Sequence, residues 1–171
     1  VCTEERRERD SIVRFLNYPV RITYVGRLDK DSEGLLLMTN NGDIINRMMR
    51  AANKHEKEYK VTVDKPVTDE FLKEMAGGVP ILDTVTRPCQ VEKLGKYKFK
   101  IILTQGLNRQ IRRMCEALGY EVKELRRVRI MNIELGNLKP GEYRKVTDQE
   151  LNELYELIRD SKSEPTPWNN N

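Results

Sequence analysis

Two carboxylates stand close together in a short, charged segment of the chain. Asp29 and Asp31 lie between Gly26 and Gly34, glycines that permit tight or unusual backbone angles. The patterns before and after this segment each predict a strand, so we expect a loop held by a rigid sheet. An ionised carboxylate placed there can act as a nucleophile or as a general base. Residue types alone also allow an ordinary turn with solvated acids, and they do not choose between the two aspartates.

Basic residues are concentrated in one later stretch, residues 105–130, whereas the last thirty residues have an acidic excess. This distribution is typical of a surface that binds a polyanion such as nucleic acid, although a charged and solvated surface is the alternative. The stretch contains seven basic residues: Arg109, Arg112, Arg113, Lys123, Arg126, Arg127 and Arg129.

A helix predicted at residues 108–118 separates charge from apolar side chains. At about 100° per residue, Arg109, Arg112 and Arg113 fall on one face. The opposite face is apolar, with Ile111, Met114, Cys115 and Leu118. With Asn108 as the N-cap and the helix dipole behind it, the start of the helix predicts an anion site for a phosphate or a carboxylate. Local pairing of the arginines with Glu116 is the alternative.

The rest of the chain reads as many strands with a few inserted helices, which predicts an α+β fold with a mixed sheet. Thr147 and Glu150 predict a capping box at the start of the last helix. Helices are expected at residues 11–16, 43–51, 69–76, 108–118 and 147–159. Strands are expected at residues 20–25, 35–39, 58–63, 97–103, 121–125 and 128–135, with short strands within 79–94.

Composition excludes several classes of protein. The chain has 171 residues, with 31 Lys and Arg against 27 Asp and Glu, and its size fits a single domain. No apolar run approaches the ~20 residues that a transmembrane helix needs. Three dispersed cysteines and a single histidine, His55, argue against a disulfide framework or a zinc site and favour a reducing, cytoplasmic compartment. We therefore expect no metal, no cofactor and no membrane.

Three segments together form a more specific pattern. They are GRLDKDSEGLL at residues 26–36, KEY at 57–59 and GLNRQIRRM at 106–114. In their order and spacing they resemble the motifs of pseudouridine synthases, and the resemblance covers about residues 20–151. It is closest to the RsuA-type branch, which modifies ribosomal RNA. HEKEY at 55–59 and GYEVK at 119–123 look most like its RluF group, which acts on large-subunit RNA.

The resemblance implies roles for particular residues. Asp29 matches the catalytic aspartate, and Tyr59 matches the tyrosine that packs on the target uracil. Arg112 matches the basic position that pairs with the catalytic carboxylate, and Arg27 matches a residue that can fill the gap left by a flipped base. Asp31 is expected to be structural or to face RNA. The implied fold is a long, mixed, mostly antiparallel sheet with flanking helices and a central catalytic cleft.

Further basic residues are expected to contact phosphates of the RNA. They are Arg109, Arg113, Arg126, Arg127, Arg129, Arg47, Arg50 and Lys54. The implied partner is a ribosomal RNA stem-loop that contains the target uridine, bound by a monomer. The implied reaction is isomerisation of a uridine to pseudouridine in 23S rRNA, with Asp29 acting as nucleophile or as base.

Two other functions stay open. One is a non-catalytic RNA-binding module for ribosome assembly, against which the joint presence of Asp29, Tyr59 and Arg112 argues. The other is a metal-dependent phosphodiesterase using both aspartates, for which further clustered ligands are missing. The resemblance also implies a preceding Lys-Pro motif and a small N-terminal RNA-binding domain, neither of which the sequence contains. We therefore expect a catalytic domain at residues 1–160, cut from a longer protein, and a disordered tail at 161–171.

Overall fold

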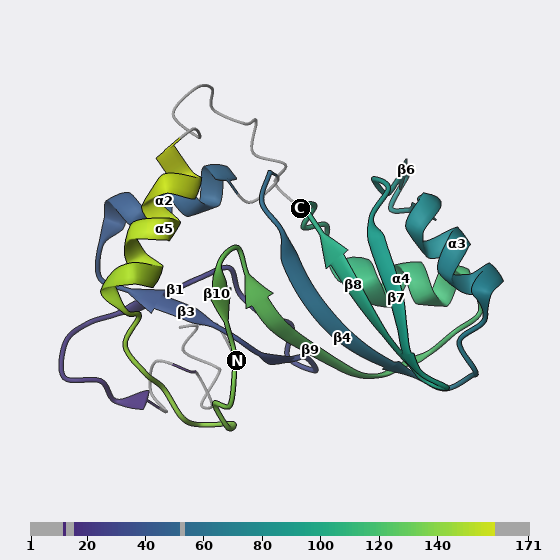
Figure 1. The fold of residues 1–171 in the computed structure, drawn as a ribbon, viewed down its shortest axis with the longest axis horizontal. Coiled ribbons are helices and arrows are strands. Elements are labelled where there is room, and N and C mark those ends of the chain that lie inside the picture. Colours follow the sequence, from purple (N-terminus) through teal and green to yellow (C-terminus); the bar gives the residue numbers. More distant parts are fainter. Residues whose placement is uncertain (1–11, 13–15, 52–53, 160–171) are drawn as a thin grey trace.

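The computed structural model describes residue 12 and residues 16–51 and 54–159. The helix expected at 11–16 falls mostly outside these residues, and the tail expected at 161–171 falls wholly outside them. The described chain folds around one sheet whose strand order is β10-β9-β4-β8-β7, with β2 also paired to β9 (Figure 1). These strands are β2 (Glu33–Gly34), β4 (Lys57–Val63), β7 (Gln90–Gly95), β8 (Lys98–Leu103), β9 (Val122–Ile130) and β10 (Ile133–Glu134).

Pairing in this sheet is antiparallel except at one place. β2 runs parallel to β9, with Glu33 opposite Arg126 and Gly34 opposite Arg127. Both β2 and β10 pair with β9, while β9 also pairs antiparallel with β4. Two small antiparallel sheets complete the strands: β1 (Thr23–Val25) with β3 (Leu37–Thr39), and β5 (Pro80–Ile81) with β6 (Thr84–Val85). The prediction of a mixed, mostly antiparallel sheet is confirmed.

Helices gather at the two ends of the sheet in Figure 1. α3 (Asp69–Gly77) and α4 (Gln110–Ala117) lie near β7 and β8, and α2 (Gly42–Ala51) and α5 (Asp148–Arg159) lie near β1 and β3. The helices predicted for α2, α3 and α5 agree with these bounds to within one residue. In the parts of the chain that the structure describes, no helix is long and apolar enough to cross a bilayer.

Each end has its own apolar core. In the first, Val61 and Phe99 of the sheet pack with Phe71 of α3 and Met114 of α4, and all four are almost fully buried. Period-two alternation produces this face, since Phe99 is buried while its neighbours on β8, Lys98 and Lys100, are wholly or partly accessible to solvent.

The second core joins α2 and α5 to the far end of β9. Ile44 and Met48 of α2 pack with Leu154 and Ile158 of α5 and with Ile130. The helical spacing of these pairs explains why each helix has one buried face. Strand β9 therefore belongs to both cores, through Leu125 at one end and Ile130 at the other.

Two expectations from the sequence are wrong in detail. The separate strands at 121–125 and 128–135 are one long strand, β9, followed by the short β10, because β9 stays paired with β4 across a register shift. The helix expected from Asn108 begins at Gln110. Arg109 precedes it in the left-handed region with φ of 48°, so Asn108 lies outside the first turn and does not cap it.

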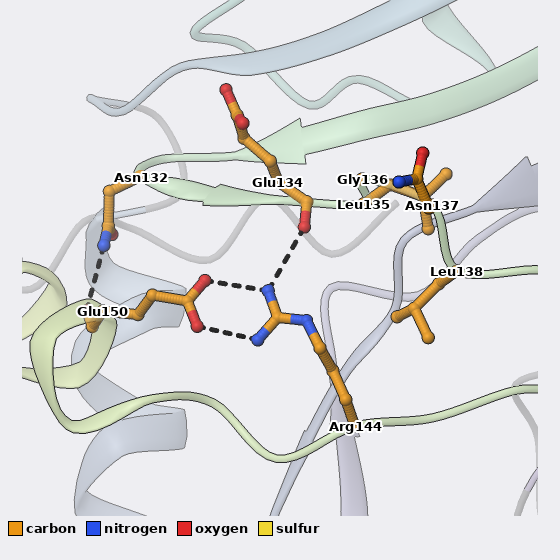
Figure 2. Close-up of a pocket in the computed structure, with 8 residues that line it drawn as sticks. All are labelled: Asn132, Glu134, Leu135, Gly136, Asn137, Leu138, Arg144 and Glu150. Atoms are coloured by element: carbon orange, nitrogen blue, oxygen red, sulfur yellow. Dashed lines mark hydrogen bonds and ion pairs between the residues drawn. The ribbon is translucent and has the colours of Figure 1, made fainter.

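A polar network fastens α5 to the edge of the sheet. Arg144 donates hydrogen bonds from both terminal nitrogens to the Glu150 carboxylate, at 2.7 and 2.8 Å. Asn132 donates to the Glu150 carbonyl at 2.9 Å, so the first turn of α5 is also tied to the segment before β10. Figure 2 shows these residues lining a shallow surface pocket of about 430 Å³. The predicted site residues do not line it.

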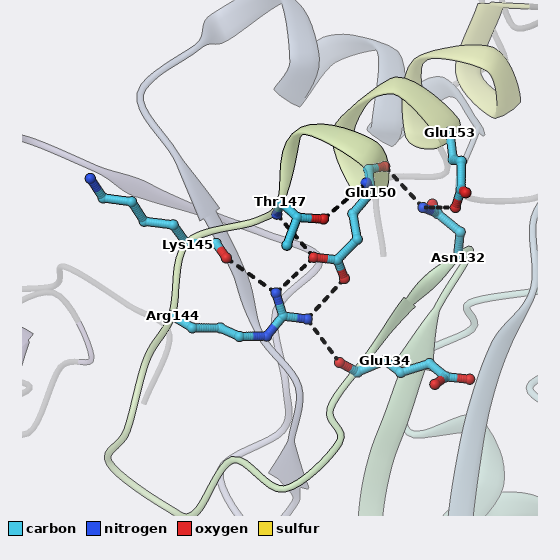
Figure 3. A network of polar contacts seen from close by, with 7 residues as sticks. All are labelled: Asn132, Glu134, Arg144, Lys145, Thr147, Glu150 and Glu153. Atoms are coloured by element: carbon cyan, nitrogen blue, oxygen red, sulfur yellow. Dashed lines mark hydrogen bonds and ion pairs between the residues drawn. The ribbon is translucent and has the colours of Figure 1, made fainter.

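The capping box predicted for α5 is confirmed. Thr147 Oγ1 accepts from the Glu150 amide at 3.1 Å, and the Glu150 carboxylate accepts from the Thr147 amide at 3.0 Å (Figure 3). The hydrogen bonds from Arg144, followed by those from Thr147, lower the pKa of Glu150 from 4.5 to about 2. A carboxylate with a lowered pKa in the folded state stabilises the fold in its ionised form.

Replacing Glu150 with Gln is expected to lower the free energy of unfolding at pH 7 by about 1 kcal/mol, because the charged cap and the bidentate Arg144 contact are weakened. The Glu150 contribution is fully present above pH ~4.5 and is lost as the pH falls towards about 2. The difference between wild type and E150Q should therefore shrink in acid. Urea unfolding between pH 7 and pH 2.5 measures this, with Glu156→Gln, a more exposed carboxylate on the same helix, as the control. A pH-independent difference would contradict the prediction.

Candidate active site

The segment that carries both aspartates forms a tight turn beside the sheet. The Ser32 amide donates to the Asp29 carbonyl at 3.0 Å, which closes a four-residue turn with Lys30 and Asp31 at its centre. The turn leads directly into β2 and the short parallel pairing with β9. The expected loop on a rigid sheet is therefore present.

Arg127 holds both ends of this loop. Its side chain is buried, with only 4% of the residue exposed, and donates to the Leu35 carbonyl at 2.9 Å and to the Gly26 carbonyl at 2.8 Å. The main chain adds a bond from the Leu35 amide to the Arg127 carbonyl at 2.7 Å. The sequence analysis expects Arg127 to contact RNA phosphate, whereas here its guanidinium is buried and donates to these two backbone carbonyls.

The same junction explains the glycine at the end of the loop. Gly34 has φ of 118°, and a Cβ there would lie 2.2 Å from the Arg127 carbonyl oxygen. That oxygen belongs to the backbone of a paired strand and has little freedom to move away. Only glycine therefore allows β2 to approach β9 this closely.

Asp31 fixes the turn to the start of α4. Its two carboxylate oxygens accept from Arg109 at 3.0 and 2.9 Å, a bidentate contact. Arg112 donates to the Asp31 carbonyl at 2.7 Å and to Ser32 Oγ at 3.3 Å, and its Nε lies 3.5 Å from an Asp31 carboxylate oxygen. The hydrogen bond from Arg109 is the main cause of the lowered pKa of Asp31, about 2. The predicted anion site at α4 is thus occupied by a carboxylate of the same chain.

Asp29 is the carboxylate of the turn that keeps its oxygens available. None of the described residues donates a hydrogen bond to its carboxylate or forms an ion pair with it. Arg112, which the sequence motif suggests as its partner, instead contacts Asp31 and Ser32. The site therefore holds one carboxylate bound by arginine and one open carboxylate two residues away.

Tyr59 lies on the same side of the sheet as Arg127, because the two residues are opposite one another in the β4–β9 register. It is half-buried and packs against the first core. Lys57 lies two residues earlier on the same face, with its Nζ 3.3 Å from the position that a Cβ on Gly106 would take. Burial, followed by repulsion from Arg127, lowers the pKa of Lys57 to about 8.

Lys57 is a site residue to which the sequence analysis assigned no role. The available signal was its place in the KEY motif, two residues from Tyr59 on an alternating strand. Its surroundings depend on Arg127 and on the loop before α4, both of which are remote in the sequence. For that reason the alternation alone could not reveal that the surroundings of this amine lower its pKa.

Two of the predicted RNA-contacting arginines lie on the opposite face of the sheet from Tyr59. Arg126 is opposite Lys60 and Arg129 is opposite Glu58 in the strand register. Arg126 donates to Glu33 at 2.9 and 3.0 Å, and Arg129 forms ion pairs with Glu56 and Glu58. Arg126 therefore contacts the residue that directly follows the turn, and the guanidinium groups of both arginines are engaged by glutamates.

The other predicted contacts are spread over two regions. Arg113 donates to the Asn108 carbonyl and to its side-chain oxygen, both at 3.0 Å, and so braces the loop before α4. Arg27 is exposed in the Asp29 loop itself. Arg47, Arg50 and Lys54 lie on or just after α2, where Arg47 pairs with Asp43 at 3.1 Å.

Within residue 12, 16–51 and 54–159, no three His, Cys, Asp or Glu side chains are grouped so that they could hold a metal ion. Cys89 and Cys115 are free thiols, and burial raises the pKa of each, to about 11 and about 12.

The chain combines a mixed sheet with an aspartate turn beside it. A half-buried tyrosine and an arginine-rich helix start lie at the same site. The chain belongs to the RNA pseudouridylate synthase family, whose sequence profile matches residues 2–117. A crystal structure of a pseudouridylate synthase superposes with a TM-score of 0.78 and 34% identity, covering 84% of this chain and 65% of that one. The fold expected from the sequence is thereby confirmed.

Among individual relatives, the chain is 58% identical over 167 residues to the dual-specificity RNA pseudouridine synthase RluF of Shigella flexneri. It is 35% identical over 156 residues to the ribosomal small subunit pseudouridine synthase A of Yersinia pestis. These alignments cover 98% and 88% of this chain but 58% and 66% of the relatives, so the chain spans well under the full length of either. The resemblance to the RsuA-type branch and to its RluF group is confirmed.

Replacing Arg127 with Lys is expected to release the loop while the rest of the sheet stays folded. A single ammonium cannot reproduce the guanidinium fork that reaches two carbonyls. Leaving a buried carbonyl without its donor costs about 1–3 kcal/mol. Hydrogen exchange should accelerate in residues 27–35 and stay unchanged in β8. The matched control is Arg126→Lys, at an exposed ion pair. We expect this substitution to change the free energy of unfolding by less than about 0.5 kcal/mol. Unchanged hydrogen exchange in the loop of R127K would contradict the role of Arg127 in holding the two ends of the loop.

Proposed function

We propose that the chain isomerises a uridine of 23S ribosomal RNA to pseudouridine, with Asp29 as the catalytic carboxylate. The observation that carries the proposal is the open Asp29 carboxylate on a turn fixed by Arg127 and Asp31, in a chain of the RNA pseudouridylate synthase family. The choice of 23S RNA rests on the similarity to RluF proteins. The chain spans 58% of the length of those relatives, so 23S RNA is a proposed substrate for this chain.

The reaction suits a single carboxylate. The bond between uracil N1 and ribose C1′ breaks, the base turns, and a bond forms between C5 and C1′, while the hydrogen on C5 is released and N1 gains one. No electrons are gained or lost overall. Asp29 can attack C1′ as a nucleophile or remove a proton at C2′ as a base, and both routes require its ionised form.

Tyr59 is proposed to receive the target base. The uridine must leave its stack before the sugar can reach Asp29, which costs a few kcal/mol. Stacking on an aromatic ring returns about 1–3 kcal/mol per base. A half-buried tyrosine anchored against the first core is a rigid platform for that purpose, since its position is set before the RNA arrives.

Arg112, which lies on α4, is proposed to support the turn from the side of the helix. Its side chain is 11% exposed and its guanidinium lies against Asp31 and Ser32, so its charge favours the ionised form of Asp31. Arg27, Arg109 and Arg113 are proposed to contact phosphates near the turn, and Arg47, Arg50 and Lys54 farther along the RNA. Arg126 and Arg129 reach phosphate only if the RNA extends to the opposite face of the sheet.

The partner is proposed to be a stem-loop of the RNA, bound by one copy of the chain in the cytoplasm. Single-stranded loops expose bases that can be splayed out and stacked, whereas an A-form helix hides them. Phosphate contacts then supply affinity, and the shape of the loop supplies most of the selectivity.

Tritium release from RNA carrying 5-tritiated uridine tests the proposal, because the reaction must exchange the hydrogen on C5. We expect release from a 23S rRNA transcript and a loss of at least about 10²-fold in the Asp29→Asn variant, with RNA affinity kept. Asp83→Asn is the control, since Asp83 is an exposed carboxylate at the tip of the β5–β6 hairpin.

Parallel assays with 16S rRNA and with bulk tRNA test the choice of substrate separately from the type of reaction. Release from one of these arms but not from 23S rRNA would overturn the substrate while keeping the chemistry. Binding of RNA without release from any arm would contradict the proposal and favour a binding module for ribosome assembly.

A further inference from the structure

The face of the sheet opposite Tyr59 is open to solvent. Side chains alternate between the two faces of a strand, so every second residue of β4 and β8 points away from the first core. None of the residues on this open face of β4, β7 and β8 is buried, and neither apolar core includes any of them. They are Glu58, Lys60, Thr62, Gln90, Glu92, Lys98, Lys100 and Ile102.

One row of side chains crosses five strands on this open face, and its three central members are cations. Lys60 of β4 lies directly opposite Lys100 of β8 on one side and Arg126 of β9 on the other. Residues opposite one another in neighbouring strands have Cβ atoms about 5 Å apart, so like charges there repel and destabilise the sheet. Glu92 continues the row on β7, and Glu33 continues it on β2. The row therefore has three adjacent positive charges, with acids at its two ends.

The acids at the ends of the row pair with the outer cations and leave the central one. Glu92 lies 2.7 Å from Lys100, and Glu33 lies 2.9 Å from Arg126. Lys60 is exposed, and within the described residues its amine takes part in no hydrogen bond or ion pair. An exposed ammonium between two further cations, with no carboxylate bound to it, attracts an anion from solution.

A second lysine extends this positive charge along β8. Lys98 lies two residues before Lys100 and diagonally across from Lys60, at a distance of about 7–8 Å. It is exposed, and its amine likewise has no ion-pair partner in the part of the chain that the structure describes. The acid on the adjoining row is Glu124, opposite Thr62, and it forms no ion pair with either lysine. Two ammonium groups are thus available to an external anion.

The row begins beside the aspartate turn. Glu33 directly follows Ser32, whose amide closes the turn, and its strand β2 is paired with β9. Neighbouring strands lie 4.7–4.9 Å apart, so Lys60 on β4 is two strand spacings, about 10 Å, from Glu33. A short length of RNA that leaves the turn over β2 therefore reaches the open face.

We propose that this open face binds the phosphate backbone of single-stranded RNA that flanks the target stem-loop, with Lys60 and Lys98 contacting phosphates. The inference rests on the proposed function for the identity of the RNA. It adds a second contact surface, on the opposite side of the sheet from Tyr59.

The chemistry of the face suits an RNA backbone. An ammonium is a compact charge with three donors, and it binds a phosphate without reading the base attached to it. An acidic protein would also meet positive charge here, but the row is continuous with the turn of a chain from an RNA-modifying family. That continuity favours a strand of the same RNA as the occupant.

Binding of two RNAs tests the surface. One is a 23S rRNA stem-loop with a single-stranded extension of about ten nucleotides on each side, and the other is the same stem-loop without extensions. Each phosphate contact on a single strand adds about 0.7 to the slope of log affinity against log salt. We therefore expect Lys60→Gln and Lys98→Gln each to weaken binding of the extended RNA about fivefold at ~0.1 M salt. Binding of the trimmed stem-loop should stay unchanged.

Lys73→Gln is the matched control. Lys73 is an exposed lysine on α3, also without an ion-pair partner among the residues that the structure describes, and its substitution should change neither affinity. K60Q should unfold at no lower temperature than wild type, because the substitution removes repulsion between neighbouring cations. Equal affinity of K60Q and wild type for the extended RNA overturns the proposal, and so does an equal loss with both RNAs.

Removal of an acid from the row gives a test in the opposite direction. Glu92→Gln removes a negative charge from the open face and releases the Lys100 amine. We expect E92Q to bind the extended RNA about threefold more tightly than wild type. Glu74→Gln, which removes the same charge from an exposed position on α3, is the control. Affinity in E92Q no higher than in E74Q would contradict the proposal.

Acetylation of lysines, followed by mass spectrometry, locates the contact without any turnover. The extended RNA should protect Lys60 and Lys98 from acetylation more strongly than Lys73, and the trimmed stem-loop should not. Tritium release without this protection overturns the inference and leaves the proposed function in place. Protection without tritium release supports the RNA-binding surface and counts against the proposed function, so the two failures are distinguishable.

Discussion

The buried guanidinium of Arg127 is the contact on which the site depends. It lies on β9 between Leu125 of the first core and Ile130 of the second, where the apolar packing is interrupted. A buried charge is costly unless it is fully hydrogen-bonded, and the carbonyls of Gly26 and Leu35 supply two of the bonds that it needs. The requirement to satisfy this group therefore draws both ends of the loop together and holds the turn between the two cores.

The arginines around the turn bind different groups and so have different structural roles. Arg127 binds backbone and determines where the loop lies, while Arg109 and Arg112 bind Asp31 and determine how the turn is oriented. The remaining carboxylate, Asp29, is the one without such a partner among the described residues. Rigid support around one open carboxylate is the arrangement expected of a preorganised site.

Local patterns predicted much of this architecture, because local signals determine local structure. The capping box of Thr147 and Glu150 and the arginine face of α4 both follow from spacing within one or two turns. The burial of Arg127 could not be predicted in this way, since it depends on a parallel pairing between β2 and β9, some ninety residues apart. The preference of Arg112 for Asp31 over Asp29 likewise depends on how the turn docks on α4, and so on tertiary geometry.

The parallel pairing of β2 with β9 has a consequence for biosynthesis. Bonds from Arg127 to Gly26 and from Arg109 to Asp31 close loops of 101 and 78 residues. Chains emerge from the ribosome starting at the N-terminus, and contacts between distant segments form late because their loop-closure entropy must first be overcome. The aspartate turn is therefore synthesised early but acquires its shape only after β9 has emerged. A nascent chain at that stage carries both aspartates of the turn without the arginine contacts that hold the turn in place.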